Sequence, residues 1–301
     1  MSPPVPTLSI LGAEGSKMCR WIAYSGTPVL LSQVLFEPSH SLIDQSLHSR
    51  MGVETTNGDG FGIGWYADES VATPAVVRDV GPAWNNRNLR EVAHHVRSGL
   101  FFAHIRAATG TAVQQSNCHP FRHGRWLWMH NGMINDFRLL RRDLAVAVDP
   151  ALYPDIEGST DSELMFFLAL TFGLTDDPPG AVARMAAFVE RTGHSHGVRH
   201  PLQMTVAVAD GERVWAFRHS SEGRSRSLFY STRVETLRAL HPDAAFLREV
   251  SDDTRLVVSE PLGDLPGAWN EVPENSYGVV QPGQDAFHAF RPDLEQDVIR
   301  G

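Results

Sequence analysis

Residues 18–26 read MCRWIAYSG and mark the point where an ordered domain is expected to begin. The preceding residues, MSPPVPTLSILGAEGSK, are rich in Pro, Ser and Gly and carry no hydrophobic period, so residues 1–18 are predicted to be a disordered extension or to lie upstream of the true start. From Cys19 to Ser25 the apolar pattern is typical of a buried strand. A strand is therefore expected to begin at the cysteine, and residues 19–301 are expected to form one domain.

A glycine-rich run at residues 57–66, NGDGFGIGWY, predicts a turn followed by an apolar strand. Glycines at this density indicate that the backbone must approach another part of the molecule closely. The spacing also fits a dinucleotide-binding fingerprint formally. That interpretation fails because Trp65 and Tyr66 stand where a helix should open, and no βαβ unit follows.

The remainder of the chain alternates between strand-length and helix-length patterns. Apolar residues recur at helical spacing over 86–98, and two further helices are predicted behind caps at Asp136 and at Thr160, the latter with Glu163 in the capping-box position. Short apolar runs predict strands at 100–105, 126–129, 203–209, 213–217, 227–231 and 255–259. Strand clusters interleaved with helix pairs favour an α+β fold in which sheets pack face to face beneath helices.

Composition and charge argue against several classes of function. A net charge of −9 with almost no lysine disfavours nucleic-acid binding, which needs clustered basic residues. No apolar run approaches the roughly 20 residues of a membrane span. Two cysteines, and no basic region followed by a long apolar stretch at the N-terminus, favour a cytoplasmic protein over a secreted one. Small molecules or other proteins are the expected partners.

Cys19 is the first candidate for chemistry. If translation starts at Met18, removal of that methionine leaves a free α-amino group on Cys19, so that nucleophile and base share one residue. An α-amino group has an unperturbed pKa of about 7.7–8.0 and accepts the thiol proton near neutral pH. The alternative is that Cys19 is a small buried side chain of the strand, which is the commoner role of a cysteine in a reducing compartment.

Three further motifs place polar groups at the ends of predicted elements. Arg106 follows a strand, where it suits bidentate binding of a carboxylate or is simply solvated. Asn131 and Gly132 offer a side-chain amide and a backbone N–H for an oxyanion hole, or else they form an Asn-Gly turn. Asp161 suits an ammonium group, or else it belongs to the helix cap at Thr160. An arginine and an aspartate together would specify an α-amino-acid head.

Taken in order, these segments resemble the class II glutamine amidotransferases, whose nucleophile is an N-terminal cysteine. The resemblance rests on MCRWIAYSG, NGDGFGIGWY, HIRAATGT, NCHPF, HNGMINDF and STDSE between Cys19 and about Phe172, and more loosely on VVSEPLG. It implies a four-layer αββα sandwich. It also implies a role for each matching residue: Cys19 as nucleophile and base, Asn131 and Gly132 as oxyanion hole, Arg106 and Thr109 as carboxylate binders, Asp161 as amino-group binder and His119 as a supporting residue of the substrate site.

The reaction that the resemblance implies is hydrolysis of a γ-glutamyl amide through a thioester on Cys19, which releases glutamate and requires no metal or cofactor. The opening motif and the glycine-rich run look most like free-standing members, similar to the γ-glutamyl hydrolases of ergothioneine synthesis and glutathione breakdown. The substrate is then glutamine or another γ-glutamyl compound. We expect any synthase that accepts ammonia to be a separate protein.

The residues before Cys19 depart from the family pattern, in which the mature chain usually begins at the cysteine. An amide in place of the free amine is not a base. Three explanations are open: translation starts at Met18, residues 1–18 are removed as a propeptide, or the protein is a non-catalytic glutamine-binding or regulatory subunit of a separate synthase. We expect the first, because the segment carries no obvious self-cleavage signal.

Two rival sites have weaker support. Cys118 and His119 are adjacent on an extended segment, where neighbouring side chains point in opposite directions and a direct nucleophile–base pair is disfavoured. His194, His196 and His200 lack the spacing of a recognisable metal site and are expected in a solvated loop before the strand at residue 203. No metal ligands are therefore predicted.

Overall fold

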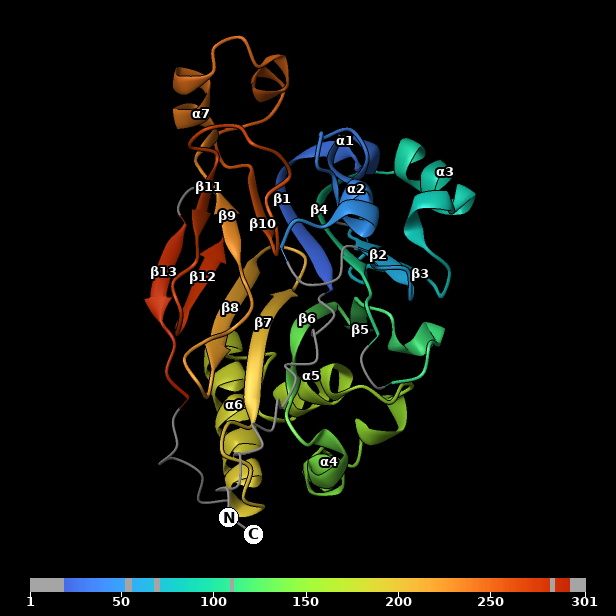
Figure 1. Cartoon of the computed structure of the whole chain (residues 1–301), viewed down its shortest axis with the longest axis vertical. Helices are drawn as coiled ribbons and strands as arrows, with labels where there is room; N and C mark the ends of the chain where they lie inside the picture. The colour runs from blue at the N-terminus through green and yellow to red at the C-terminus, as the bar shows by residue number, and fades with distance from the viewer. Residues whose placement is uncertain (1–18, 52–55, 68–70, 109–110, 282–284, 293–301) are drawn as a thin grey trace, which may run out of the picture.

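The computed structural model describes residues 19–51, 56–67, 71–108, 111–281 and 285–292, with two antiparallel sheets at its centre (Figure 1). The first sheet has seven strands, in the order β11 (Trp269–Glu271), β9 (Phe229–Ser231), β10 (Arg255–Val258), β1 (Arg20–Leu30), β4 (Arg97–Ile105), β2 (Phe61–Trp65) and β3 (Ala75–Asp79). The second has six, in the order β13 (Ala286–Ala289), β12 (Ser276–Val280), β8 (Val214–Ser220), β7 (Leu202–Ala209), β6 (Trp126–Ile134) and β5 (Phe121–His123).

Helices cover the outer face of each sheet (Figure 1). The first sheet carries α1 (Leu31–Leu35), α2 (Leu42–His48) and α3 (Arg87–His95). The second carries α4 (Phe137–Val146), α5 (Asp161–Thr171) and α6 (Pro178–Ser195). A smaller apolar cluster joins α7 (Val234–Leu240) to the 3₁₀ turn η4 (Ala245–Arg248). The other 3₁₀ turns are η1 (Ala83–Asn85), η2 (Gln115–Asn117) and η3 (Tyr153–Asp155).

A further apolar cluster lies between the two sheets. It joins Trp21 and Ala23 of β1 to Leu127 and Met129 of β6 and to Ala207 of β7. The layers therefore run helix, sheet, sheet, helix. This order confirms the predicted α+β class and the four-layer αββα sandwich.

Strand β1 shows why this sequence forms the middle of a sheet. Its side chains alternate between the two faces: Trp21 and Ala23 enter the core between the sheets, whereas Ile22 and Tyr24 pack beneath the helices. All four are almost inaccessible to solvent. Full burial of a large apolar side chain contributes roughly 1.5–3 kcal/mol, so this strand fixes the chain firmly just after Cys19.

The helix caps only partly follow the prediction. Thr160 caps α5 as expected, because its hydroxyl accepts a hydrogen bond from the Glu163 N–H. Glu163 does not complete a capping box, since its carboxylate accepts from the Glu157 and Gly158 N–H groups instead. Asp136 precedes α4, but its backbone is left-handed and its side chain makes no capping hydrogen bond. The prediction for Glu163 is wrong because the loop before α5 uses its carboxylate, and the prediction for Asp136 is wrong because its backbone is left-handed and not extended as in a usual N-cap.

Two elements differ from the prediction, one in its bounds and one in its existence. The predicted strand at 126–129 continues to Ile134, so Asn131 and Gly132 lie inside β6, opposite β7, rather than in a turn. The sequence pattern did not indicate helix α6, which places His194 in its last turn rather than in a loop. The short apolar run marks only the apolar part of β6, because the next two buried residues, His130 and Asn131, are polar.

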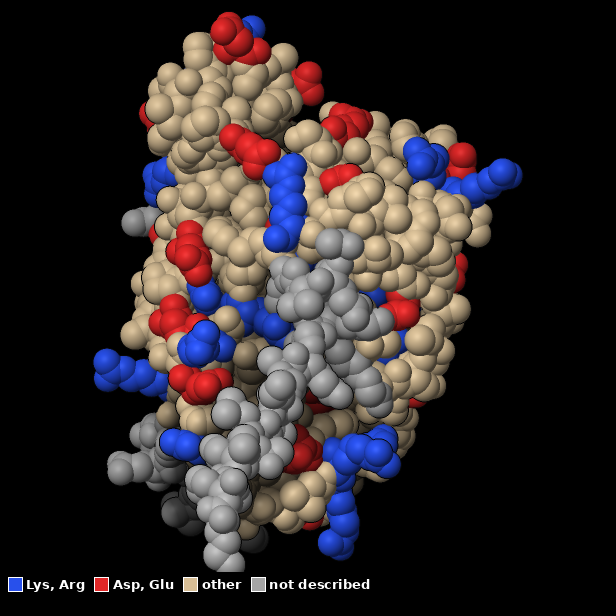
Figure 2. Space-filling model, in the orientation of Figure 1, with Lys and Arg blue, Asp and Glu red and all other residues tan. Residues whose placement is uncertain are grey.

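Acidic and basic side chains are interspersed on the face shown in Figure 2. Ion pairs such as Arg50 with Asp264, at 2.8 Å, join neighbouring opposite charges. None of the described helices has the length and apolar character needed to cross a membrane.

Candidate active site

Cys19 lies just before β1, partly exposed, with its sulfur facing the segment that follows β4. β1 and β4 pair antiparallel with Arg20 opposite Ile105, which brings Ala107 next to the cysteine. The Ala107 N–H donates to Cys19 Sγ at 3.4 Å, and the thiol lies 3.6 Å from the Ala107 carbonyl oxygen. A backbone N–H in this position stabilises a thiolate, so the place suits a nucleophile.

Two opposing influences act on the Cys19 thiol. Burial raises its pKa above the ordinary value, because a thiolate is poorly solvated there. The Ala107 N–H and the positive charges of Arg106, Arg20 and Arg226 lower the pKa. Burial is the larger effect, so the thiol stays protonated at neutral pH and needs a base before it can attack.

A pocket of about 510 Å³ opens beside Cys19. It is lined by the end of β6, the start of α4, the start of α5 and the segment after β4. Five residues singled out from the sequence meet in it: Cys19, Arg106, His119, Gly132 and Asp161. Its volume falls in the roughly 300–1,000 Å³ range of small-molecule sites. The topology thus gathers motifs that are far apart in the chain.

Asn131 and Gly132 are neighbours in β6, beside the cysteine. Asn131 Nδ2 donates to the Cys19 carbonyl oxygen at 3.0 Å. An amide nitrogen carries two hydrogens, so one is left for a ligand. Gly132 has a φ of 155°, and a Cβ there would lie 2.0 Å from the Gln203 carbonyl oxygen, so a larger residue does not fit. The pair places a side-chain donor next to Cys19 and a glycine backbone in the pocket wall.

Arg106 is buried, and its guanidinium is held by the loop that follows it. Nη2 donates to Thr111 Oγ1 at 2.7 Å and to the Ala112 carbonyl oxygen at 3.1 Å. A guanidinium has five N–H groups, so others remain for a carboxylate in the pocket that Arg106 lines. Arg106 is therefore not a solvated strand-end residue. The other expected carboxylate binder, Thr109, lies outside the described residues.

Asp161 is the first residue of α5. Its Oδ2 accepts a hydrogen bond from the Ile134 N–H at 2.8 Å, and its Oδ1 accepts from the Ser162 N–H at 2.7 Å. These bonds fix the carboxylate against the end of β6. A carboxylate has about four acceptor positions, so it can still accept from a ligand ammonium. With Arg106 in the same pocket, the site carries the two charges that an α-amino-acid head requires.

Buried histidines form part of the pocket wall. The rings of His104 and His119 lie with their centroids 4.2 Å apart. Burial lowers the pKa of His104 to about 3 and holds that of His119 well below 6.5, so both rings are neutral at neutral pH. Neither ring nitrogen of His119 has a hydrogen-bond partner among the described residues. His130, which the sequence did not single out, lies with Nδ1 2.7 Å from Ser162 Oγ.

The glycines of β2 determine where His119 lies. A Cβ on Gly62 would be 2.1 Å from the His119 carbonyl oxygen, and one on Gly64 would be 2.8 Å from Pro120 Cγ. Side chains at these positions would push the histidine segment away from the sheet. The predicted close approach of backbone at the glycine-rich run is therefore confirmed. Asp59 of the same run also fixes the pocket, because its Oδ2 accepts from the Ala108 N–H at 2.8 Å.

A buried ion pair anchors Arg20, the residue that follows Cys19. Arg20 Nη1 donates to the Cys19 carbonyl oxygen at 3.0 Å, and Arg20 Nε donates to Glu260 Oε2 at 2.7 Å. His40 Nε2 lies 2.6 Å from the other oxygen of Glu260. Sequence reasoning missed this group. Its signals were the arginine of MCR and the glutamate of VVSEPLG, which no spacing rule connects.

Cys118 occupies a very different position. Its side chain is fully buried, with Sγ 3.4 Å from the Asp79 carbonyl oxygen and 3.7 Å from that of Gln114. Burial raises the pKa of this thiol to about 11. A thiol with this pKa is a poor nucleophile, so the rival pair of Cys118 and His119 has no support. Within the described ranges, no cluster of three or more metal-ligating side chains occurs.

Solved structures of known proteins share this fold. A glutamine aminotransferase class-II domain protein from Silicibacter pomeroyi is 34% identical, covers 91% of this chain and 99% of its own, and superposes with a TM-score of 0.69. The glutamine phosphoribosylpyrophosphate amidotransferase of B. subtilis superposes with a TM-score of 0.61 at 15% identity, over 90% of this chain and 49% of its own. The second likeness shows the fold alone, and the fold is that of the glutamine amidotransferases.

Sequence comparisons define the family. The model of the class-II glutamine amidotransferases matches residues 29–297. A probable glutamine amidotransferase of Saccharomyces cerevisiae, DUG3, is 33% identical over 93% of this chain and 86% of its own length. A γ-glutamyl-hercynylcysteine sulfoxide hydrolase of Mycolicibacterium smegmatis is 28% identical over 85% of this chain and 93% of its own. The chain belongs to the class-II glutamine amidotransferases, a family of enzymes, and the recognition from its motifs is confirmed.

Proposed function

We propose that this protein hydrolyses a γ-glutamyl amide with Cys19 as nucleophile, and that residues 19–301 are the active unit. One observation carries the proposal: Cys19 Sγ lies 3.4 Å from the Ala107 N–H, in a pocket that Arg106 and Asp161 also line. A nucleophile beside one cation and one anion suits an amino acid whose side-chain amide reaches the sulfur.

Binding fixes the α-amino-acid head. The α-carboxylate accepts hydrogen bonds from Arg106, with Thr109 as the second proposed binder, and the α-ammonium donates to Asp161. The neutral ring of His119 supports the pocket wall without adding charge. This arrangement leaves the γ-amide as the part of the ligand that faces Cys19.

The first chemical step forms a thioester. The free α-amino group of Cys19 takes the thiol proton, and the sulfur attacks the γ-carbonyl carbon. The resulting oxyanion accepts hydrogen bonds from the second hydrogen of Asn131 Nδ2 and from the Gly132 N–H. The C–N bond then breaks, and the leaving amine takes the proton from the Cys19 ammonium.

The second step releases glutamate. The Cys19 amine takes a proton from water, the hydroxide attacks the thioester carbonyl, and the same oxyanion donors serve again. The C–S bond breaks and the proton returns to the sulfur. The steps as proposed use only the protein's own groups and water.

The mechanism requires Cys19 to begin the mature chain. We propose that translation from Met18 followed by methionine removal provides this, because an acylated nitrogen is not a base. A form that keeps residues 1–18 would hold the same pocket without turnover. That form would be the alternative, a glutamine-binding or regulatory subunit of a separate synthase.

The substrate is proposed to be glutamine or another γ-glutamyl compound, acted on in the cytoplasm. Support comes from the relative named for hydrolysis of a γ-glutamyl compound, which is similar over most of both chains. Hydrolysis needs no second protein. Transfer of ammonia to a synthase would need one, and such a partner belongs to the alternative outcome.

The function is tested by glutamate release from a panel of glutamine, γ-glutamylglycine and α-glutamylglycine. The account predicts turnover of γ-linked compounds and none of the α-linked isomer, because only a free α-amino and α-carboxyl head pairs with Asp161 and Arg106. Asparagine, one methylene shorter, should react at least about tenfold more slowly. Equal turnover of the α-linked isomer would contradict the proposal.

A further inference from the structure

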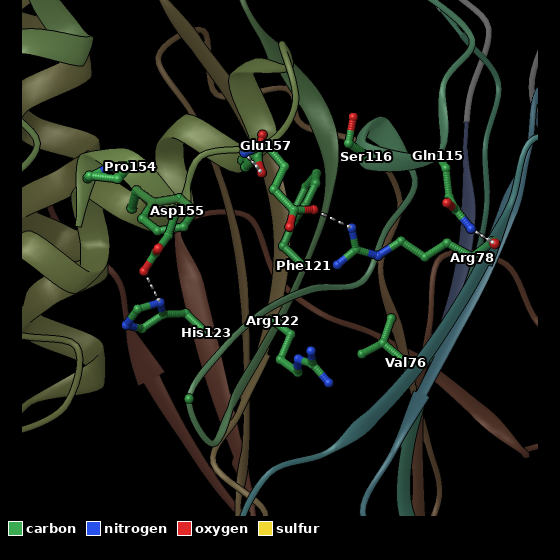
Figure 3. A pocket seen from close by; sticks show the side chains of 13 residues that line it. Val76, Arg78, Gln115, Ser116, Phe121, Arg122, His123, Pro154, Asp155 and Glu157 are labelled. Carbon is green, nitrogen blue, oxygen red and sulfur yellow. Dashed lines mark hydrogen bonds and ion pairs between the residues drawn. The ribbon is translucent and has the colours of Figure 1, made fainter.

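A second pocket, of about 560 Å³, lies between β3, β5 and the segment at η3 (Figure 3). Two stretches of chain, 115–121 and 157–163, contribute lining residues both to it and to the Cys19 pocket. None of the described residues assigned a role in hydrolysis lines it. Its volume is that of a small-molecule site, and its lining is mostly polar.

Arg78 has hydrogen-bonding capacity that its surroundings do not use. Its side chain is only 16% exposed, and its Nε is buried without a hydrogen-bond partner among the described residues. The carboxylate of Glu157 is 4.0 Å from Nη1, beyond hydrogen-bond distance. The guanidinium lies over the Phe121 ring, 5.8 Å from its centroid, which holds it in place. A partly buried arginine whose buried Nε has no partner is costly unless a ligand completes it.

Arg122 adds a second positive charge to the same pocket. Its Nη1 donates to the Pro74 carbonyl oxygen at 3.1 Å, which leaves other N–H groups available. Figure 3 shows Arg78 reaching into the pocket from β3 and Arg122 from β5. The two charges lie near enough for Arg122 to lower the pKa of Arg78, after the larger effect of burial. Two planar guanidinium groups at one cavity suit the binding of a carboxylate.

Two exposed acidic groups also line the pocket, and each contacts a basic side chain of the same pocket (Figure 3): Glu157 lies 4.0 Å from Arg78 Nη1, and Asp155 lies 3.4 Å from His123 Nδ1. Asp155 and Glu157 have side chains 56% and 71% exposed, so their oxygens are accessible to a ligand. Glu163 differs, because both its oxygens accept backbone hydrogen bonds. Two accessible carboxylates repel a polyanion but attract an ammonium. The pocket therefore offers two guanidinium groups and two exposed carboxylates, and the ion-pair contacts of those carboxylates are as long as 3.4 and 4.0 Å.

We propose that this pocket binds a small zwitterion, an amino acid or a dipeptide, with its carboxylate on Arg78 and Arg122 and its ammonium on Asp155 and Glu157. The site is separate from the proposed γ-glutamyl site and does not depend on hydrolysis. The partly buried guanidinium of Arg78 would hold the ligand's carboxylate and the exposed carboxylates its ammonium, which gives the ligand one orientation.

The proposal is tested by calorimetric titration of glycylglycine into the full chain. Arg78→Gln and Arg122→Gln should each weaken binding at least tenfold. Arg90→Gln is the matched control, because Arg90 also lies over an aromatic ring, 5.1 Å from the centroid of Phe36, but outside the pocket; its affinity should not change. Arg122 is exposed, so its variant keeps the fold even if the Arg78 variant does not.

The chemistry of the ligand is tested with acetate, methylamine and inorganic phosphate, each expected to bind at least tenfold more weakly than glycylglycine. Phosphate or acetate binding as tightly as the dipeptide would overturn the zwitterion assignment. Absence of glycylglycine binding at millimolar concentration would overturn the site. So would binding that Asp161→Asn abolishes and the Arg122 variant leaves intact, because the dipeptide would then occupy the Cys19 pocket. These readouts need no turnover, so failure of the proposed hydrolysis is a separate result.

Discussion

The two cysteines of this chain are both free thiols, and burial raises the pKa of both while nearby arginines lower it, but they differ in exposure and in hydrogen-bond partners. Cys19 is partly exposed, receives an N–H from Ala107 and lies in the field of three arginines. Cys118 is buried and faces only carbonyl oxygens among its hydrogen-bond partners. Donors stabilise a thiolate and acceptors do not. The comparison teaches that the neighbours supplied by the fold, and not the residue type, separate a candidate nucleophile from a structural thiol.

The largest expected effect separates these two thiols directly. Replacement Cys19→Ala should lower kcat for γ-glutamyl hydrolysis by about 10³-fold or more, because the covalent route is lost. Cys118→Ala should leave kcat within about twofold. Steady-state glutamate release measures both, and circular dichroism shows whether each variant is folded. Retained turnover in the Cys19 variant would reverse the assignment.

The next effect concerns the donors that only Cys19 has nearby. Asn131→Ala should reduce kcat by about 10²–10³-fold with a smaller change in KM, because the oxyanion exists only after attack. Asn270 is a matched control: it lies in β11, its Nδ2 also makes one hydrogen bond, and Asn270→Ala should not alter kcat. A rise in KM with an unchanged kcat would show that Asn131 binds the substrate in its ground state instead.

A third test examines substrate binding in the pocket beside Cys19. Arg106→Lys should raise KM for glutamine by about 10- to 100-fold, since a bidentate charged contact of roughly 1.5–3 kcal/mol is lost. Asp161→Asn should do the same through the ammonium. Initial rates over a range of glutamine concentrations give the values. An unchanged KM in both variants would contradict the proposal that Arg106 and Asp161 bind the α-amino-acid head of the substrate.

Much of this site could be predicted because its residues sit in contiguous motifs. MCR, HIRAATGT, HNG and STDSE each carry one polar group at a strand or helix end, and the four-layer sandwich brings those ends together. The glycines of β2 also predicted a close contact between backbone segments, because glycine at this density is typical of such contacts. Local sequence was sufficient to predict pocket residues whose position depends on a single motif.

Contacts between distant backbone and side-chain groups could not be predicted. The Ala107 N–H on Cys19 depends on the register of β1 with β4, which no local pattern states. The ion pair of Arg20 with Glu260 spans most of the chain. Glu163 fits a capping box by spacing, but tertiary structure gives its carboxylate to the Glu157 and Gly158 N–H groups. A capping pattern in the sequence fails as a prediction where N–H groups of a loop bind the same carboxylate.

The smallest expected effect is a loss of stability in acid, in the buried region next to Cys118. His104 and His119 have folded-state pKa values below 6.5, so below pH 6.5 the unfolded chain binds protons that the folded chain does not. Stability should then fall as pH drops below 6.5, by up to about 1.4 kcal/mol per pH unit for each ring. Urea unfolding at pH 7.5 and 5.5 measures it.

A variant identifies the source of that slope. His104→Gln should flatten the pH dependence, whereas His95→Gln, at a side chain 76% exposed, should not change it. An identical slope in both variants would place the titrating groups elsewhere in the molecule.

The central claim is that Cys19 acts through its own α-amino group. The most direct measurement compares two preparations with intact masses verified, one beginning at Cys19 and one that keeps residues 1–18, for glutamate release from glutamine and γ-glutamylglycine. The account predicts turnover by the first preparation only. Equal turnover by the chain that keeps residues 1–18, or none by either, would contradict it.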